Sequence, residues 1–306
     1  MYTQIPWPIR VALILSPILL TCLVSIEKDK YEPPSTFFLS QTWNCYDIIW
    51  LLVLFLLIGC ISWVLVWKGV ISLSQLNSYG TFVLLVLAAI LLYTILRSKY
   101  GLKISTLGLS FENSIPNVIL GLRISFVLGF IWFFGALLIG EDQLLLDRSR
   151  WFYNTRGLEM ASGHQLFVFF FTALVAAPIV EESVFRGFMY SPFRRKIGHK
   201  GSVFVTSLVW AIWHSDMRSA VSLIITGIIL VYFYVKTQSL IPSMIIHSMT
   251  NLTWFITLLY LWLFQNDILP LNSNKFIMFM ALFFLFGFII LSIISRRMSP
   301  KRRAGG

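Results

Sequence analysis

The 306-residue chain is poor in charge: Asp, Glu, Lys and Arg together make up only 12% of it. Soluble domains carry about a quarter charged residues, so the composition argues against a soluble globular protein. Hydrophobic residues make up 58% of the sequence, and the mean hydropathy is +0.81. We therefore predict a polytopic membrane protein, in which a single helical domain can use most of the length.

Metal and disulfide signatures are also scarce. The chain has only three cysteines, Cys22, Cys45 and Cys60, and they form no CxxC or Cys/His metal spacing. No HExxH zinc motif occurs, and there are no internal repeats, which many transporters show. The sequence therefore predicts neither a resident metal nor another cofactor.

The basic excess is large, with a net charge of +11, but it does not indicate nucleic-acid binding. Lys and Arg lie in short loops and at the C-terminus, and the chain has no long soluble basic domain. This distribution is typical of the positive-inside pattern of membrane proteins. We therefore expect membrane lipids as partners, and no nucleic acid.

Apolar runs of about 20 residues predict membrane-spanning helices. Nine runs qualify, at 8–26, 47–67, 79–96, 117–140, 165–188, 201–215, 219–236, 240–265 and 275–295. The first follows a single arginine but has no convincing cleavage site, so we interpret it as a helix rather than a signal peptide. If it is removed or lies flat, eight spans remain.

The basic residues also predict the orientation. With the C-terminal "RRMSPKRR" in the cytoplasm, the inside segments hold more than twice as many Lys and Arg residues as the outside segments. We therefore predict a multi-pass protein of the cell membrane with a cytoplasmic C-terminus. The run 194–200 is interpreted as a determinant of this topology, with binding of an anionic substrate or lipid as the alternative.

Polar residues inside the predicted spans are few, and they converge. Of the thirteen acidic residues, eleven lie in loops or at the ends of predicted helices, and only Glu181 and Glu182 fall inside a span. His214 and His247 lie in or at the ends of apolar helices, and Asn251 follows one turn after His247. Charges within a bilayer are costly and commonly functional, so these residues form the candidate site.

Spacing suggests how these residues divide their roles. Glu182 and Arg186 are four apart with the acid first, the favoured order for an ion pair on a helix. Glu181 is rotated by about 100° from Glu182, so it is available for another task. His247 and Asn251 also share one helix face.

Depth within the predicted spans was estimated from about 1.5 Å of rise per residue. Glu181 and His247 each come out roughly 10 Å from the inner end of their helices. His214 comes out at roughly 20 Å in its short helix. Three helices are thus expected to bring polar groups to a similar level, nearer the cytoplasmic side.

Three motifs carry a resemblance to a known family. "EESVFR" (181–186), "WAIWH" (210–214) and "HSMTN" (247–251) resemble, in order and spacing, the motifs EExxxR, aromatic-xxx-His and HxxxN. These belong to the CAAX protease and bacteriocin-processing (Abi) family of intramembrane glutamic endopeptidases. Phenylalanine is commoner than Trp210 in the second motif. The resemblance spans about 106–260.

The resemblance implies a catalytic role for four residues. Glu181 would be the general base that activates water for peptide hydrolysis. His214 would hold the same water and shuttle its proton. His247 and Asn251 would form the oxyanion hole, whose fixed donors stabilise the tetrahedral intermediate.

Glu182 and Arg186 would be the supporting ion pair. The expected fold is an all-α transmembrane bundle of eight to nine helices with a cytoplasm-facing intramembrane cavity. We expect N-terminal helices in 1–105, a CAAX-protease-like catalytic core in 106–265, and a last helix with a basic tail in 266–306. The expected substrate is a membrane-associated protein or peptide.

Other interpretations stay open at this point. The two glutamates are also compatible with a structural ion-pair cluster, and His247 and Asn251 with interhelical hydrogen bonds. Glu181, His214 and His247 match the ligand count of a catalytic zinc, although that reading gives Asn251 no role. A non-proteolytic scaffold, immunity protein or transporter built on the same core is the alternative function.

Overall fold

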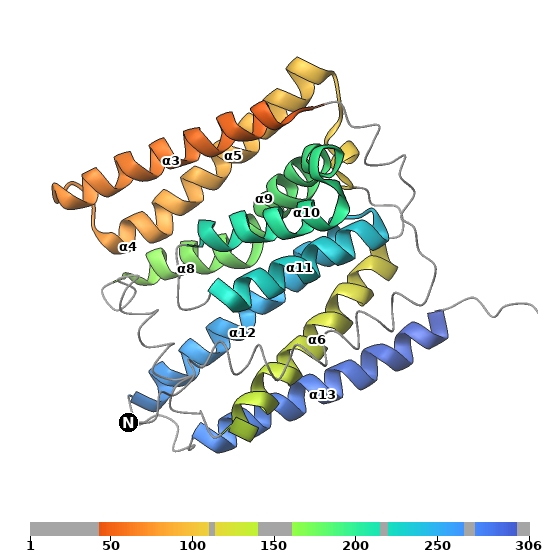
Figure 1. Cartoon of the computed structure of the whole chain (residues 1–306). Helices are drawn as coiled ribbons and strands as arrows, with labels where there is room; N and C mark the ends of the chain where they lie inside the picture. Colours follow the sequence, from red (N-terminus) through yellow and green to blue (C-terminus); the bar gives the residue numbers. More distant parts are fainter. Residues whose placement is uncertain (1–42, 110–113, 140–160, 215–219, 266–272, 299–306) are drawn as a thin grey trace, which may run out of the picture.

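The computed structural model describes residues 43–109, 114–139, 161–214, 220–265 and 273–298, and every regular element in these ranges is a helix (Figure 1). The α-helices are α3 (Cys45–Trp67), α4 (Leu73–Gln75), α5 (Thr81–Thr94), α6 (Ser114–Ile139), α8 (Gly163–Phe171), α9 (Ala177–Glu182), α10 (Tyr190–Trp213), α11 (Ala220–Thr237), α12 (Ile241–Gln265) and α13 (Ser273–Met298). Between them lie the π-helical turns η1 (Leu76–Gly80), η2 (Ile95–Lys99), η5 (Thr172–Ala176) and η6 (Ser183–Met189), and the 3₁₀ turn η3 (Ile104–Leu107). The predicted all-α class is confirmed.

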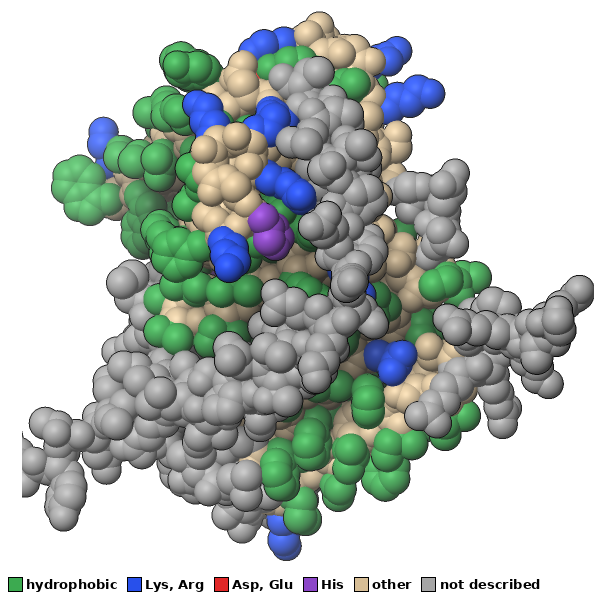
Figure 2. Space-filling view, turned by 45° about the vertical axis from the view of Figure 1, so that its right-hand side comes forward, with side chains coloured by type: hydrophobic (Ala, Val, Ile, Leu, Met, Phe, Trp, Pro, Cys, Tyr) green, Lys and Arg blue, Asp and Glu red, His purple; other side chains and the backbone are tan. Residues whose placement is uncertain are grey.

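The helices suit a membrane. Within the described residues, six helical segments are long and apolar enough to cross one, which agrees with a multi-pass protein. Each predicted span from 47–67 onward overlaps a helix, whereas the predicted span 8–26 lies outside the described residues. Large hydrophobic side chains are exposed along these helices. Figure 2 shows such side chains spread over one face, as expected where lipid tails replace water.

The helices are arranged in layers around the segment that carries the glutamates (Figure 1). Helices α3 and α5 lie on one side of α8–α10, and α11 and α12 lie on the other. The pair α6 and α13 covers the far side of α12. Arg123 of α6 donates to Ser295 of α13 at 3.3 Å, which ties this outer pair together.

The helix that carries Glu181 and Glu182 is the centre of the bundle. All twelve residues from 181 to 192 are buried, and α9 contacts both α5 and α12. A helix buried on every face must find partners for its polar groups inside the protein. Glu181 and Glu182 must therefore be satisfied by polar groups of the neighbouring helices.

The chain reverses at one glycine between α9 and the end of α10. The sequence predicted two spans, 165–188 and 201–215, with a loop between them. Instead, residues 163–213 are helical almost throughout, and only Gly198 (φ 73°, ψ −179°) leaves the helical region. A positive φ costs glycine little because it has no Cβ. The prediction missed the extension because a bilayer-length criterion counts only apolar residues.

The segment just before α6 anchors the core. Leu107 of η3 is fully buried, and its carbonyl oxygen accepts a hydrogen bond from the Tyr234 hydroxyl at 3.0 Å. The Gly108 carbonyl accepts from the Leu240 backbone N–H at the α11–α12 turn, also at 3.0 Å. The beginning of the predicted core 106–265 therefore packs against the helices that carry its later motifs.

Candidate active site

Glu181 is held at the end of α9 and is 8% exposed. Its Oε2 atom accepts a hydrogen bond from the indole N–H of Trp210 at 2.9 Å. The same oxygen lies 3.9 Å from Nε2 of His214. That separation is too long for a direct hydrogen bond but short enough for a shared water or substrate atom.

Glu182 faces a different neighbourhood from Glu181. Its Oε1 atom accepts from Nη1 of Arg186 at 2.9 Å and from Nδ1 of His247 at 2.9 Å. Glu182 and Arg186 are fully buried, and His247 is 2% exposed. The ion pair expected from the four-residue spacing therefore forms, and it also holds a histidine from α12.

These contacts bring three helices to one point. One possible ligand atom each from Glu181, His214 and His247 lies within 4.8 Å of the others. The residues come from α9, the C-terminal end of α10, and α12. Three of the four predicted catalytic side chains thus share one cluster, as the convergence argument expected.

The register of the α9–α10 hairpin explains why Glu181 and His214 meet. Glu181 lies 17 residues before Gly198, and His214 lies 16 residues after it. At 1.5 Å per residue, both stand about 25 Å from the turn. The expected depths of roughly 10 and 20 Å assumed that the helices end near 188 and begin near 201, whereas the helices continue to Gly198. The depth of both residues in the membrane stays a prediction.

The fine geometry fixes which ring nitrogens carry protons. Nδ1 of His214 lies 2.9 Å from the carbonyl oxygen of Trp210, and Nδ1 of His247 lies 2.9 Å from Glu182. Carbonyl and carboxylate oxygens only accept, so Nδ1 is the protonated nitrogen in both rings. A neutral imidazole then has a lone pair on Nε2, and only an imidazolium can donate from there.

Comparison with protein families agrees with the motifs. Residues 163–253 match the family model of the type II CAAX prenyl endopeptidases, Rce1-like. The resemblance is therefore confirmed for this segment, which contains all three motifs and the whole Glu/His cluster. No curated protein and no solved structure matches the chain.

In this CAAX-endopeptidase-like segment, Asn251 is engaged in interhelical contact. Its Nδ2 donates to the Ala173 carbonyl oxygen at 2.7 Å, and Ser248 donates to the neighbouring Leu174 carbonyl oxygen at 2.7 Å. This is the interhelical bond that the sequence left open for Asn251. A side-chain amide has two N–H donors, and this bond uses one of them.

The π-helical turns explain where those acceptors come from. Both carbonyls belong to η5, and η6 begins immediately after Glu182, so a π turn flanks each side of the six-residue α9. Turns of this kind are rare in proteins as a whole, but those that occur are often found at functional sites. A π turn changes which side chains share a helix face. The local sequence did not predict them.

Trp210 is the site residue that sequence reasoning undervalued. It is 2% exposed, and its ring centroid lies 4.4 Å from the His214 ring and 5.4 Å from the His247 ring. The Arg186 guanidinium carbon is 4.8 Å from the same ring. Trp210 therefore joins both halves of the site, and its N–H adds a donor that phenylalanine lacks. The sequence analysis treated the tryptophan of "WAIWH" only as a departure from the usual motif, because the sequence alone does not show whether its N–H has an acceptor.

Proposed function

We propose that this protein is a membrane-embedded endopeptidase that hydrolyses peptide bonds with a water activated by Glu181. The observation that carries the proposal is the cluster of Glu181, His214 and His247 inside a segment that matches CAAX prenyl endopeptidases. The family match supports proteolysis as the reaction. The residue roles below are our own assignment.

In the proposed reaction, Glu181 removes a proton from water while the water oxygen bonds to the substrate carbonyl carbon. The resulting tetrahedral intermediate collapses when the carbon–nitrogen bond breaks, and the proton passes to the leaving nitrogen. His214 suits the shuttling role because its Nε2 faces the same Glu181 oxygen at 3.9 Å. Trp210 holds that oxygen and so orients the carboxylate.

His247 is assigned to stabilise the oxyanion, together with Asn251. Because Nδ1 of His247 donates to Glu182, Nε2 can donate to an oxyanion only in the imidazolium form. Glu182 is therefore assigned as a positioning residue that sets the orientation of His247.

The decisive experiment compares peptide termini in membranes from cells carrying the wild-type protein or Glu181→Gln. Glutamine keeps the size and polarity but cannot accept the proton. We expect a defined set of termini to disappear in the variant, since loss of a general base costs about 10²–10⁴-fold. If the two profiles are identical while both proteins rescue a deletion phenotype, the non-proteolytic scaffold, immunity or transport function takes over.

A metal-dependent protease is the second candidate, and one observation favours it. Each histidine donates Nδ1–H to a protein oxygen, as metal-ligating histidines do, and neutral Nε2 atoms then provide ligands beside the Glu181 carboxylate. Purified enzyme treated with excess chelator and desalted separates the two mechanisms. Full activity supports the glutamate base, whereas a loss restored by Zn²⁺ alone supports the metal.

We also propose a location and an orientation in the membrane. We place the protein in the cell membrane with its C-terminus in the cytoplasm, because the basic residues gather in the segments predicted to lie inside. The reaction would take place below the membrane surface, in a cavity open to the cytoplasm. The substrates would be membrane-associated proteins or peptides.

A further inference from the structure

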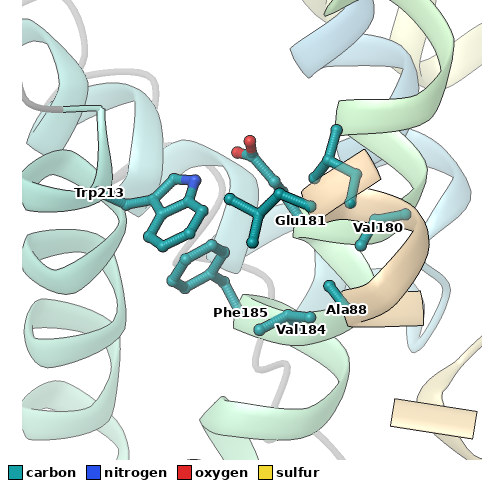
Figure 3. A pocket seen from close by; sticks show the side chains of 8 residues that line it. Ala88, Val180, Glu181, Val184, Phe185 and Trp213 are labelled. Carbon is teal, nitrogen blue, oxygen red and sulfur yellow. The ribbon is translucent and has the colours of Figure 1, made fainter. Parts of the chain in front are cut away.

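Arg123 is a charged residue inside a membrane-spanning helix that takes no part in the candidate site. It lies on α6, within the apolar span Ser114–Phe134, whereas Figure 3 shows Glu181 beside apolar side chains of α5, α9, η6 and α10. Helix α6 also lies outside the segment 163–253 that matches the endopeptidase family. A charge inside a membrane is costly and commonly functional, so Arg123 needs an explanation that the catalytic motifs do not provide.

The Arg123 guanidinium uses few of its hydrogen-bond donors. Nη1 donates to the Ser295 hydroxyl of α13 at 3.3 Å, and the guanidinium carbon lies 5.8 Å from the centre of the Phe288 ring. Nε is buried and has no hydrogen-bond partner among the described residues. Nη2 has no partner among them either, and it is not buried. Because arginine stays protonated in proteins, the seam between α6 and α13 presents a permanent cation with unused donors.

The described part of the chain does not supply a counter-charge for this cation. Its ranges contain three acidic residues, Asp47, Glu181 and Glu182. Asp47 is paired with Lys99, and both glutamates belong to the candidate site. The partner of Arg123 is therefore to be sought in what surrounds the helices.

The contact with Ser295 places the guanidinium near one membrane surface. Ser295 is the last residue of the apolar span Lys275–Ser295, and the sequence continues with Arg296 and Arg297. Long cationic side chains near the end of a span extend to the interface, and phospholipid headgroups lie at this level.

An apolar stripe on α13 leads to the same end of the helix. Its members are exposed and recur at helical spacing on one face: Phe286, Ile289, Ile290, Ile293 and Ile294. Phe288 and Ser295 lie seven residues apart on the side that contacts Arg123. Hydrocarbon tails can therefore cover the stripe while the charged seam beside it receives a headgroup.

We propose that Arg123 and Ser295 form a binding site for the phosphate group of an anionic phospholipid, in the seam between α6 and α13. The unused N–H groups of the guanidinium donate to the phosphate oxygens, for which the planar fork of arginine is suited. Ser295 positions the guanidinium. A lipid of net negative charge is favoured over a zwitterionic one because it neutralises the cation. This inference does not depend on the proposed endopeptidase function.

The test measures lipid binding by the purified full-length protein in detergent. The protein is titrated with phosphatidylglycerol, phosphatidylcholine or inorganic phosphate, and binding is followed by native mass spectrometry and by the rise in melting temperature. We expect phosphatidylglycerol to bind about 5-fold or more tightly than phosphatidylcholine. Inorganic phosphate should give no shift, because it has no acyl chains to bury. Equal binding of the two lipids, or an equal shift with inorganic phosphate, would overturn the anionic-lipid site.

Three variants that each lower the net charge by one locate the site. Arg123→Gln is expected to weaken phosphatidylglycerol binding about 10-fold, since it removes hydrogen bonds from a charged group. Ser295→Asp provides an internal carboxylate for Arg123, so phosphatidylglycerol should no longer raise the melting temperature. Arg97→Gln, at an exposed arginine on η2, is the control and should bind phosphatidylglycerol like the wild type.

The two seam variants keep the proposal open to refutation. If Arg123→Gln does not accumulate in membranes, Ser295→Asp still decides the question. Unchanged phosphatidylglycerol binding in either seam variant, or an equal loss in Arg97→Gln, would overturn the site. Neither result bears on the peptide termini that depend on Glu181, so the endopeptidase proposal is tested separately.

Discussion

One carboxylate oxygen organises half of the candidate site. Oε1 of Glu182 receives Arg186 and His247 together, while Glu182 Oε2 and Arg186 Nε are buried and have no hydrogen-bond partner among the described residues. A buried network that is only partly satisfied stabilises less than it could. Such a network is better explained by the task of orienting His247 than by stability alone.

Removing Arg186 should harm the fold as well as turnover. Arg186→Ala leaves Glu182 buried without its cation, a change that costs on the order of 3–5 kcal/mol. We expect a clearly lower melting temperature in detergent and loss of cleavage. Arg97→Ala, at an exposed arginine on η2, is the control and should melt like the wild type. An unchanged melting temperature for Arg186→Ala would contradict the buried ion pair.

Replacing Trp210 tests a hydrogen bond without removing the aromatic ring. Trp210→Phe deletes the donor to Glu181, and hydrogen bonds to charged groups contribute about 1.5–3 kcal/mol. We expect kcat to fall roughly 10-fold or more with little change in KM, and the melting temperature to fall less than in Arg186→Ala. Trp63→Phe, at a 61% exposed site on α3, should have no effect. Equal kcat for Trp210→Phe and wild type would remove Trp210 from the site.

At the scale of single residues, the sequence predicted which charged residues pair, but not which side chains donate hydrogen bonds in the candidate site. The four-residue spacing was enough for Glu182 and Arg186, because helical geometry places such residues together. Nothing in "WAIWH" distinguishes a tryptophan that donates to Glu181 from one that only packs. The use of Asn251 as a donor to Ala173 depends on the π turn η5, which no local pattern indicated.

At the scale of elements, α10 and α11 approach closely at Gly227. A Cβ added there would lie 2.9 Å from Cβ and 3.0 Å from Cα of Ser207. The Gly227 carbonyl oxygen also accepts from Nη2 of Arg186 at 3.4 Å. Small residues of this kind let membrane helices pack backbone to backbone, and here the contact supports the buried arginine.

Two glycine substitutions should therefore have opposite effects. Gly227→Ala forces α10 and α11 apart, because backbone cannot rotate out of the way, and overpacking costs about 1–3 kcal/mol. Gly59→Ala on α3 meets nothing within 4 Å and should be neutral or stabilising, since alanine favours helix by up to about 1 kcal/mol. Thermal melts of both variants in detergent would show the difference. Equal melting temperatures would argue against the close contact.

The apolar runs predicted the helices well and their ends less well. Length and hydropathy located the long described helices, because the bilayer imposes both; the short α4 lies outside every predicted span. The prediction failed between 188 and 201 because the two arginines and two lysines of this stretch lie outside the apolar run, where a helix can continue without being apolar. The turn depends on the conformation of Gly198 alone.

At the scale of the whole molecule, the N-terminal helices are not a separate unit. Trp43, just before α3, is fully buried; its indole N–H donates to the Phe188 carbonyl at 2.6 Å, and its ring stacks on Phe188. Asp47 at the start of α3 accepts hydrogen bonds from Lys99 at the end of η2 and from Tyr100, which follows it, each at 2.5 Å. These contacts fasten α3 and α5 to the helix of the EExxxR motif.

The orientation of the bundle can be tested at its two ends. In a background without Cys22, Cys45 and Cys60, single cysteines replace the exposed Lys68 after α3 or the exposed Lys103 after α5. A membrane-impermeant maleimide should label Lys68→Cys in intact cells and Lys103→Cys only after permeabilisation. The reverse pattern would place the C-terminus outside and invert the predicted topology.

The turn at Gly198 makes the meeting of Glu181 and His214 depend on the lengths of the two arms of the α9–α10 hairpin, which are 17 and 16 residues. A residue inserted into one arm would shift every residue beyond it by about 1.5 Å and turn it by about 100°. His214 would then point away from Glu181, although every motif residue would still be present. Only a matching insertion in the other arm would restore the level. Lineages of this protein should therefore change the two arm lengths together or not at all.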